Sequence, residues 1–120
     1  MSLIQYEVTP TPSAQTATPL PDIRVAVYPK FQIINKGQDA IMQCRDEGDN
    51  RSFVVWRRKH HKHLPRASKE VHGRLEIFHV TEREAGDYIC VSQAYEHFPG
   101  GSQVSTLKIY SRYPSYTQVP

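Results

Sequence analysis

Short segments of alternating apolar and polar residues recur along the middle of the chain, and this pattern predicts β-strands. Side chains two positions apart in a strand lie on the same face. In the segment AIMQC this places Ala40, Met42 and Cys44 on one face, with Ile41 and Gln43 on the other. We expect the first set to face a hydrophobic core.

Further segments show the same alternation and are separated by turn residues. IRVAVY and FQII precede the turn NKGQD, while FVVW and RLEIFHV follow AIMQC. Leu75 and Ile77 share a face in RLEIFHV, and Leu107 and Ile109 belong to the last segment. Many short strands bounded by turns are typical of a sandwich or a barrel. The chain is therefore expected to be all-β.

The periodic part of the chain covers residues 22–110, which we interpret as one folded domain. Residues 1–21 are rich in Thr and Pro without an apolar face, which predicts a disordered linker. The first three residues, 1–3, are typical of residues added for expression. Residues 111–120 lose the periodicity and predict a second linker. Linkers on both sides indicate a domain within a longer chain.

The composition adds a covalent constraint. A chain of 120 residues with 38% hydrophobic residues can bury one modest core. Its two cysteines are too few for a disulfide-dense miniprotein and lack the close spacing of a zinc or redox motif. One long-range bridge is the natural interpretation, with two unpaired buried thiols as the alternative. A bridge indicates an oxidising, extracellular compartment. No segment has the apolar run needed to cross a membrane, and no signal peptide is apparent.

Four residues carry a resemblance to a known family. The spacing of Cys44, Trp56, Tyr88 and Cys90 over residues 22–110 resembles the immunoglobulin fold. The resemblance implies an immunoglobulin-like β-sandwich of two antiparallel sheets. It also implies one inter-sheet disulfide between the two cysteines, with the Trp side chain packed on it and the Tyr forming a corner.

Details of the resemblance refine the expected subtype. The segment EAGDYIC is similar to the family's Asp-x-Gly-x-Tyr-x-Cys ending, with Glu84 where Asp is usual. In the family this acidic residue often pairs with a basic one, here Lys69 or Arg66. The short interval after Trp56 leaves no room for an extra hairpin, which implies the intermediate set (I-set). GQDAIMQCR and GDYICVSQAY resemble immunoglobulin repeats of perlecan-like basement membrane heparan sulfate proteoglycans.

The most unusual segment is RRKHHKH, residues 57–63, directly after the tryptophan. Residues 57–74 contain seven basic residues and one acidic residue, a net charge of plus six, whereas the whole chain carries only plus three. Concentrated positive charge attracts polyanions. We therefore expect a basic hairpin that binds heparan sulfate or a similar sulfated glycan. The candidate residues are Arg57, Arg58, Lys59, Lys62 and Arg66.

Other interpretations of the basic run stay open or are excluded. The charges could instead keep an exposed strand edge from pairing with other chains. Nucleic acid is excluded because a disulfide-bridged secreted domain would rarely meet it. A metal site is not expected, because only His61 and His63 would share a strand face and no further ligand completes a tetrahedral site.

The remaining motifs concern modification and recognition. Asn50, with Arg51 and Ser52, forms an N-glycosylation sequon in a loop. The segment QAYEHFPGGSQ is either a recognition loop or a plain glycine hairpin. No catalytic motif appears, so neither enzymatic activity nor a cofactor is expected.

These features together predict an extracellular interaction module. We expect one immunoglobulin bead of a secreted basement membrane or extracellular matrix proteoglycan. Its partners would be matrix or cell-surface proteins and heparan sulfate, without insertion into a membrane. The alternative is a domain of a cell-surface adhesion molecule or receptor that binds a protein.

Overall fold

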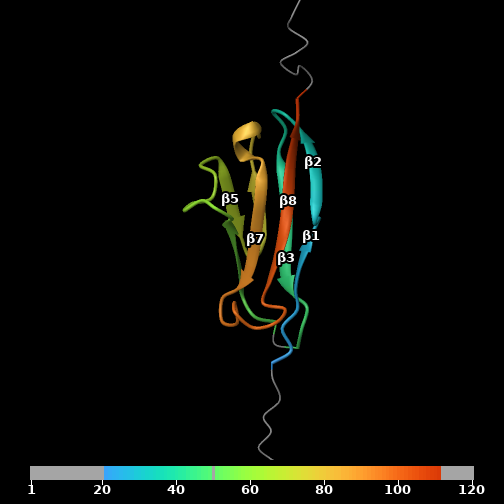
Figure 1. Ribbon diagram of the computed structural model, residues 1–120, viewed down its shortest axis with the longest axis vertical. Coiled ribbons are helices and arrows are strands. Elements are labelled where there is room, and N and C mark those ends of the chain that lie inside the picture. Colours follow the sequence, from blue (N-terminus) through green and yellow to red (C-terminus); the bar gives the residue numbers. More distant parts are fainter. Residues whose placement is uncertain (1–20, 50, 112–120) are drawn as a thin grey trace, which may run out of the picture.

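The computed structural model describes residues 21–49 and 51–111, which form a sandwich of two four-stranded sheets (Figure 1). The elements in chain order are β1 (Val25–Tyr28), β2 (Phe31–Asn35), β3 (Ala40–Asp46), β4 (Val54–Arg58), β5 (Ser68–Val71), β6 (Arg74–Ile77), the 3-10 helix η3 (Glu82–Glu84), β7 (Gly86–Ser92) and β8 (Ser102–Tyr110). The predicted all-β immunoglobulin-like sandwich is confirmed. The predicted linkers lie outside the described residues apart from Pro21 and Ser111.

The first sheet has the strand order β1-β3-β6-β5, and the second has the order β2-β8-β7-β4. Neighbouring strands are antiparallel in both sheets except for β2 and β8, which run parallel. The exception arises because the chain leaves the first sheet after β1 and passes through Pro29 and Lys30 into the second sheet. β2 therefore runs in the same direction as the last strand of the domain.

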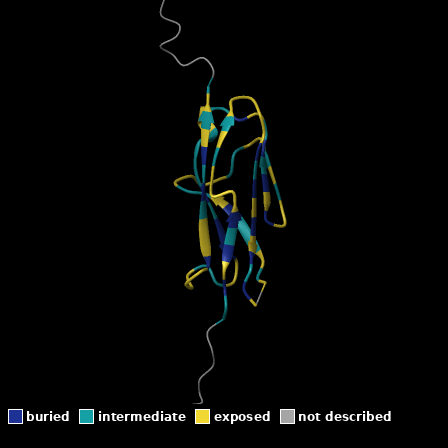
Figure 2. Ribbon diagram, turned by 90° about the vertical axis from the view of Figure 1, so that its right-hand side faces the viewer, coloured by how far each residue is buried: buried dark blue, intermediate teal, exposed yellow. Residues whose placement is uncertain are grey.

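The core lies between the two sheets and is formed by alternate residues of the strands, as Figure 2 shows by the alternation of buried and exposed positions. Ala40, Met42 and Cys44 of β3 are buried, as the alternation predicts, and so are Leu75 and Ile77 of β6. The largest buried side chains of the second sheet are those of Trp56 and Tyr88.

The predicted disulfide is present and joins the two sheets. Cys44 in β3 is bonded to Cys90 in β7, with 6.5 Å between their Cα atoms. Trp56, in register with Cys90 on the neighbouring strand, is 2% exposed. Its indole Nε1–H donates a hydrogen bond to the carbonyl oxygen of Gly73 at 2.8 Å. A ring from one sheet is thus anchored to the β5–β6 turn of the other.

The chain enters and leaves the domain at opposite ends. In Figure 1 the segment before β1 lies at the bottom of the sandwich, while the end of β8 lies at the top. We call these ends the N-terminal pole and the C-terminal pole. Domains with this arrangement can follow one another in a line without the chain turning back.

Candidate functional site

The basic run after Trp56 is not a hairpin, which corrects the sequence-based expectation. β4 is an edge strand of the second sheet, whereas β5 is an edge strand of the first. Residues 59–67 therefore cross from one sheet to the other, and they form the green loop that projects at the left of Figure 1. We call residues 59–67 the crossover loop.

Arg57 and Arg58 point to opposite faces of β4, since successive side chains alternate in a strand. Arg57 is on the outer face and pairs with Glu96, with 2.7 Å between Nη1 and Oε2. Arg58 is half-buried on the inner side, where its Nη2 donates to the carbonyl oxygens of Arg83 and Ala85. Both side chains thus bond to groups of the domain itself, and they do not form one cationic surface.

The guanidinium of Arg58 also lies over the ring of Tyr88, 5.5 Å from its centroid. The Tyr88 hydroxyl donates to the carbonyl oxygen of Glu84 at 2.7 Å. Burial raises the pKa of Tyr88 to about 12, and the nearby Arg58 only partly opposes this. Arg58 therefore belongs to the structural support of the tyrosine corner.

The expected pairing of Glu84 with Lys69 or Arg66 is wrong. The Glu84 carboxylate instead caps its own 3-10 helix: Oε1 accepts hydrogen bonds from the backbone N–H and the hydroxyl of Thr81, at 2.7 and 2.9 Å. Arg58 takes over the cationic role by binding the carbonyls at the end of this helix. In a capping box, a glutamate side chain bonds to the residue at the start of its own helix. The Glu84 carboxylate is therefore bonded to Thr81 and not to a basic side chain, and the basic residue at this corner is Arg58 on β4.

Three of the five candidate glycan-binding residues lie on the crossover loop. Lys62 and Arg66 are exposed, and Lys59 is half-buried. Among the described residues, none of these three side chains forms an ion pair. The structure therefore separates the predicted cluster into two residues bonded to the domain and three without an ion-pair partner in the described ranges.

The histidines of the run lie in the same loop and do not form a metal site. His60, His61 and His63 are exposed and belong to turns and bends, so they share no strand face. Within residues 21–49 and 51–111, no group of three or more metal-binding side chains comes together. No helix in these ranges is long and apolar enough to cross a membrane.

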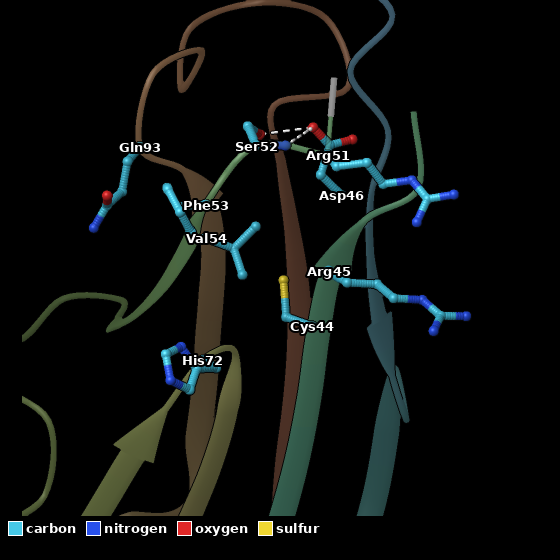
Figure 3. Close-up of a pocket in the computed structure, with 9 residues that line it drawn as sticks. All are labelled: Cys44, Arg45, Asp46, Arg51, Ser52, Phe53, Val54, His72 and Gln93. Carbon is cyan, nitrogen blue, oxygen red and sulfur yellow. Dashed lines mark hydrogen bonds between the residues drawn. The ribbon is translucent and has the colours of Figure 1, made fainter. Parts of the chain in front are cut away.

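A buried carboxylate that sequence analysis missed organises the loop before β4. Asp46 is 3% exposed. Its Oδ1 accepts hydrogen bonds from the backbone N–H groups of Arg24 and Gly48, both at 2.9 Å. Its Oδ2 accepts from the backbone N–H of Ser52 at 2.9 Å and from the Ser52 hydroxyl at 2.6 Å (Figure 3). Burial alone would raise the pKa of Asp46, but these hydrogen bonds outweigh it and lower the pKa to about 2.

The sequon residue Asn50 lies outside the described residues. Ser52, the third residue of the sequon, has a structural role: its hydroxyl bonds to Asp46 and lies 2.7 Å from the hydroxyl of Ser92. A serine at this position is therefore explained by the loop itself. N-glycosylation at Asn50 stays a prediction.

A pocket of about 460 Å³ opens beside this loop, between β3 of one sheet and β4 of the other (Figure 3). Phe53, at its rim, is 79% exposed. The Ser52 hydroxyl in the pocket donates to Asp46, and the lowered pKa of this carboxylate makes it a weak base for activating a nucleophile. The lining residues are Cys44, Arg45, Asp46, Arg51, Ser52, Phe53, Val54, His72 and Gln93.

The predicted recognition loop is built around its aromatic residues. Tyr95 and Phe98 meet edge to face, with 5.2 Å between their ring centroids. Glu96 between them holds Arg57, and the buried Gly101 lies where a Cβ atom would meet the Tyr95 carbonyl oxygen. This glycine is therefore needed for the loop's own packing.

Comparison with known proteins places the chain within one family. Residues 21–93 match the model of the immunoglobulin domain family. Contactin-4 of Rattus norvegicus is 26% identical over 102 residues, covering 83% of this chain and 10% of that protein. Basement membrane proteoglycan of Caenorhabditis elegans is 34% identical over 74 residues, covering 59% of this chain and 2% of that protein. The chain thus spans a tenth or less of the length of these relatives.

Solved structures show the same fold. The mouse nectin-like molecule 4 ectodomain superposes with a TM-score of 0.58 at 19% identity, over 77% of this chain and 31% of that chain. The tandem immunoglobulin repeats of Dlar superpose with a TM-score of 0.56 at 19% identity, over 77% of this chain and 51% of that chain. At this identity the likeness concerns the fold alone.

Proposed function

Because this chain belongs to the immunoglobulin domain family, we propose that it is a non-enzymatic extracellular interaction module, one bead of a multidomain protein. The position of the two poles carries the proposal: the chain enters at one end of the sandwich and leaves at the other (Figure 1). The Cys44–Cys90 disulfide supports an extracellular location, since such bridges persist in oxidising compartments. The eight described strands lack the extra hairpin of a variable domain, which favours the I-set.

The parent protein we propose is a secreted basement membrane or matrix proteoglycan. The match to the Caenorhabditis elegans basement membrane proteoglycan supports this assignment. A cell-surface adhesion molecule or receptor is the second candidate. The longer match to Contactin-4 favours it.

Heparan sulfate is the glycan we propose for the crossover loop. Lys59, Lys62 and Arg66 support it, because their cationic groups form no ion pairs within the described residues. Arginine can bind a sulfate with paired donors, while lysine adds a mobile charge. The exposed histidines of the loop would strengthen the interaction on protonation.

Heparin chromatography with a salt gradient tests the glycan-binding residues. The triple variant Lys59→Ser, Lys62→Ser, Arg66→Ser should elute at lower salt than the unchanged chain. Its matched control is Lys30→Ser, Lys36→Ser, Lys108→Ser, which removes the same charge from another edge of the molecule. An equal shift in both triple variants would show only a response to net charge. It would contradict a site on the crossover loop.

A second experiment separates the two parent classes. The tagged chain is added to cell layers and to cell-free matrix, each with and without heparinase treatment. Retention on matrix that heparinase abolishes supports the proteoglycan module and its glycan partner. Retention on cells that survives heparinase favours the adhesion molecule. Failure to bind either surface would contradict the proposed interaction module.

A further inference from the structure

Strand β2 forms an open edge of the second sheet. It pairs with β8 on one side, and it is the first strand in the sheet order. In a parallel ladder, alternate residues of a strand bond to the partner strand. The N–H of Thr106 donates to the carbonyl of Lys30 and that of Lys36 donates to the carbonyl of Tyr110, so the even-numbered positions face β8. The backbone groups of Phe31 and Ile33 therefore point away from the sheet.

The side chains of the same two residues are also exposed. Phe31 is 54% exposed and Ile33 is 60% exposed, both on the outer face of the sheet. Gln32 points the other way and donates from Nε2 to the carbonyl of Ile41 in the first sheet, at 3.2 Å. Apolar side chains beside free backbone groups are what an added strand would cover.

Two of the other three edge strands each have an outward backbone N–H that is bonded within the domain. On β4, the N–H of Trp56 donates to the carboxylate of Glu70 at 2.7 Å. On β1, the N–H of Val25 donates to the carbonyl of Gly100 at 2.9 Å. Within residues 21–49 and 51–111, the outward backbone groups of Phe31 and Ile33 have no hydrogen-bond partner, and the side chains of both residues are apolar and exposed.

The charges around β2 indicate which kind of strand it would accept. Lys30 and Lys36 flank the strand, and Lys108 lies in register with Ile33 on β8. Only Lys36 has an acidic partner among the described residues, Glu82 at 3.3 Å. An antiparallel pair of two copies centred on Ile33 would place Lys30 of each copy opposite Lys36 of the other. Like charges directly opposite destabilise a strand pair, which disfavours a second copy.

We propose that the free edge of β2 binds an extended segment of a partner protein that has apolar residues in its centre and acidic residues at its ends. The segment pairs with the backbone of Phe31 and Ile33, and its acidic ends meet Lys30 and Lys36, which flank the strand. The surface lies at the edge of the sheet opposite β4, which leads into the crossover loop. Its test is therefore independent of the heparin test.

Amide exchange with a synthetic probe tests the site on the full chain. The probe is a short blocked peptide with alternating valine and threonine in its centre and aspartates at both ends. Exchange of the Phe31 and Ile33 amides should slow about tenfold when the peptide is bound. A peptide with lysines at both ends should bind about tenfold more weakly. Protection at other strands, equal affinity for both peptides or no binding of either would overturn the proposal.

Two substitutions locate the contact. Ile33→Lys should weaken binding of the acidic peptide about tenfold, because it adds charge at the centre of the apolar contact. Val71→Lys, at an exposed position of β5 in the other sheet, is the matched control and should leave affinity unchanged. Phe31→Ser gives a second test if Ile33→Lys fails to fold. Sedimentation that shows a dimer abolished by Ile33→Lys would replace the peptide partner with a second copy.

Discussion

The carboxylate of Glu70 in β5 accepts a hydrogen bond from the backbone N–H of Trp56 in β4, with 2.7 Å between Oε2 and N. The two residues belong to different sheets, and each lies on an edge strand. One side chain thus satisfies a backbone donor at the edge of the facing sheet. It also bridges the opening of the sandwich beside the buried indole.

Replacing Glu70 with Ala should lower the free energy of unfolding by about 1–3 kcal/mol, because the Trp56 N–H loses its acceptor. Glu70→Gln keeps an acceptor oxygen of similar reach and should cause a smaller loss. Urea unfolding followed by tryptophan fluorescence measures both. Equal losses in the two variants would assign the effect to the charge of Glu70 and not to its hydrogen bond.

Gly73 should not accept a side chain. Its φ is +86°, and a Cβ atom would lie 2.3 Å from the carbonyl oxygen of Cys44. Gly73→Ala should therefore cost about 3 kcal/mol or more, and it should disturb the bond from the Trp56 indole. Gly37→Ala is the matched control: its φ is +92° but the added Cβ meets no atom within 4 Å. The control should cost about 1–2 kcal/mol in thermal or urea unfolding.

Strand β5 shows why part of this architecture could not be predicted from the sequence. The segment SKEV has no apolar alternation, because its inward position is occupied by Glu70. The role of Glu70 depends on the backbone N–H of Trp56, which lies fourteen positions earlier in the chain. Cys44 and Trp56, by contrast, are residues that the alternation places inward, and the structure has both in the core.

The candidate site was only partly predictable for a related reason. Counting alternate positions from the inward Trp56 already separates Arg57 from Arg58, and counting onward from Cys44 places Asp46 inward. These signals were available in the sequence. The carbonyls that bind Arg58 belong to residues 83 and 85, and no local pattern indicates that they approach β4.

Arg58 should behave as a structural residue. Arg58→Ala removes the donors to two carbonyls and the cation over the Tyr88 ring, and it should lower the free energy of unfolding by about 2 kcal/mol. Lys59→Ala removes the same charge one position later and should change it by less than about 0.5 kcal/mol. Urea unfolding of the two variants provides the comparison. Similar values would contradict the assignment of Arg58 to the tyrosine corner.

The Asp46 network predicts a loss of stability in acid. The pKa of this carboxyl is about 2 in the folded chain, below its ordinary value of 3.8. Since the pKa is lowered on folding, the contribution is fully present above about pH 4 and is lost as the pH falls toward 2. The shift corresponds to about 2 kcal/mol. Urea unfolding at a series of pH values should show this loss in the unchanged chain.

Asp46→Asn should be less stable at neutral pH and should lose less stability in acid. Asp49→Asn, an exposed change in the same loop, should keep the full loss, and an acid profile of Asp46→Asn parallel to that of the unchanged chain would contradict the role of Asp46.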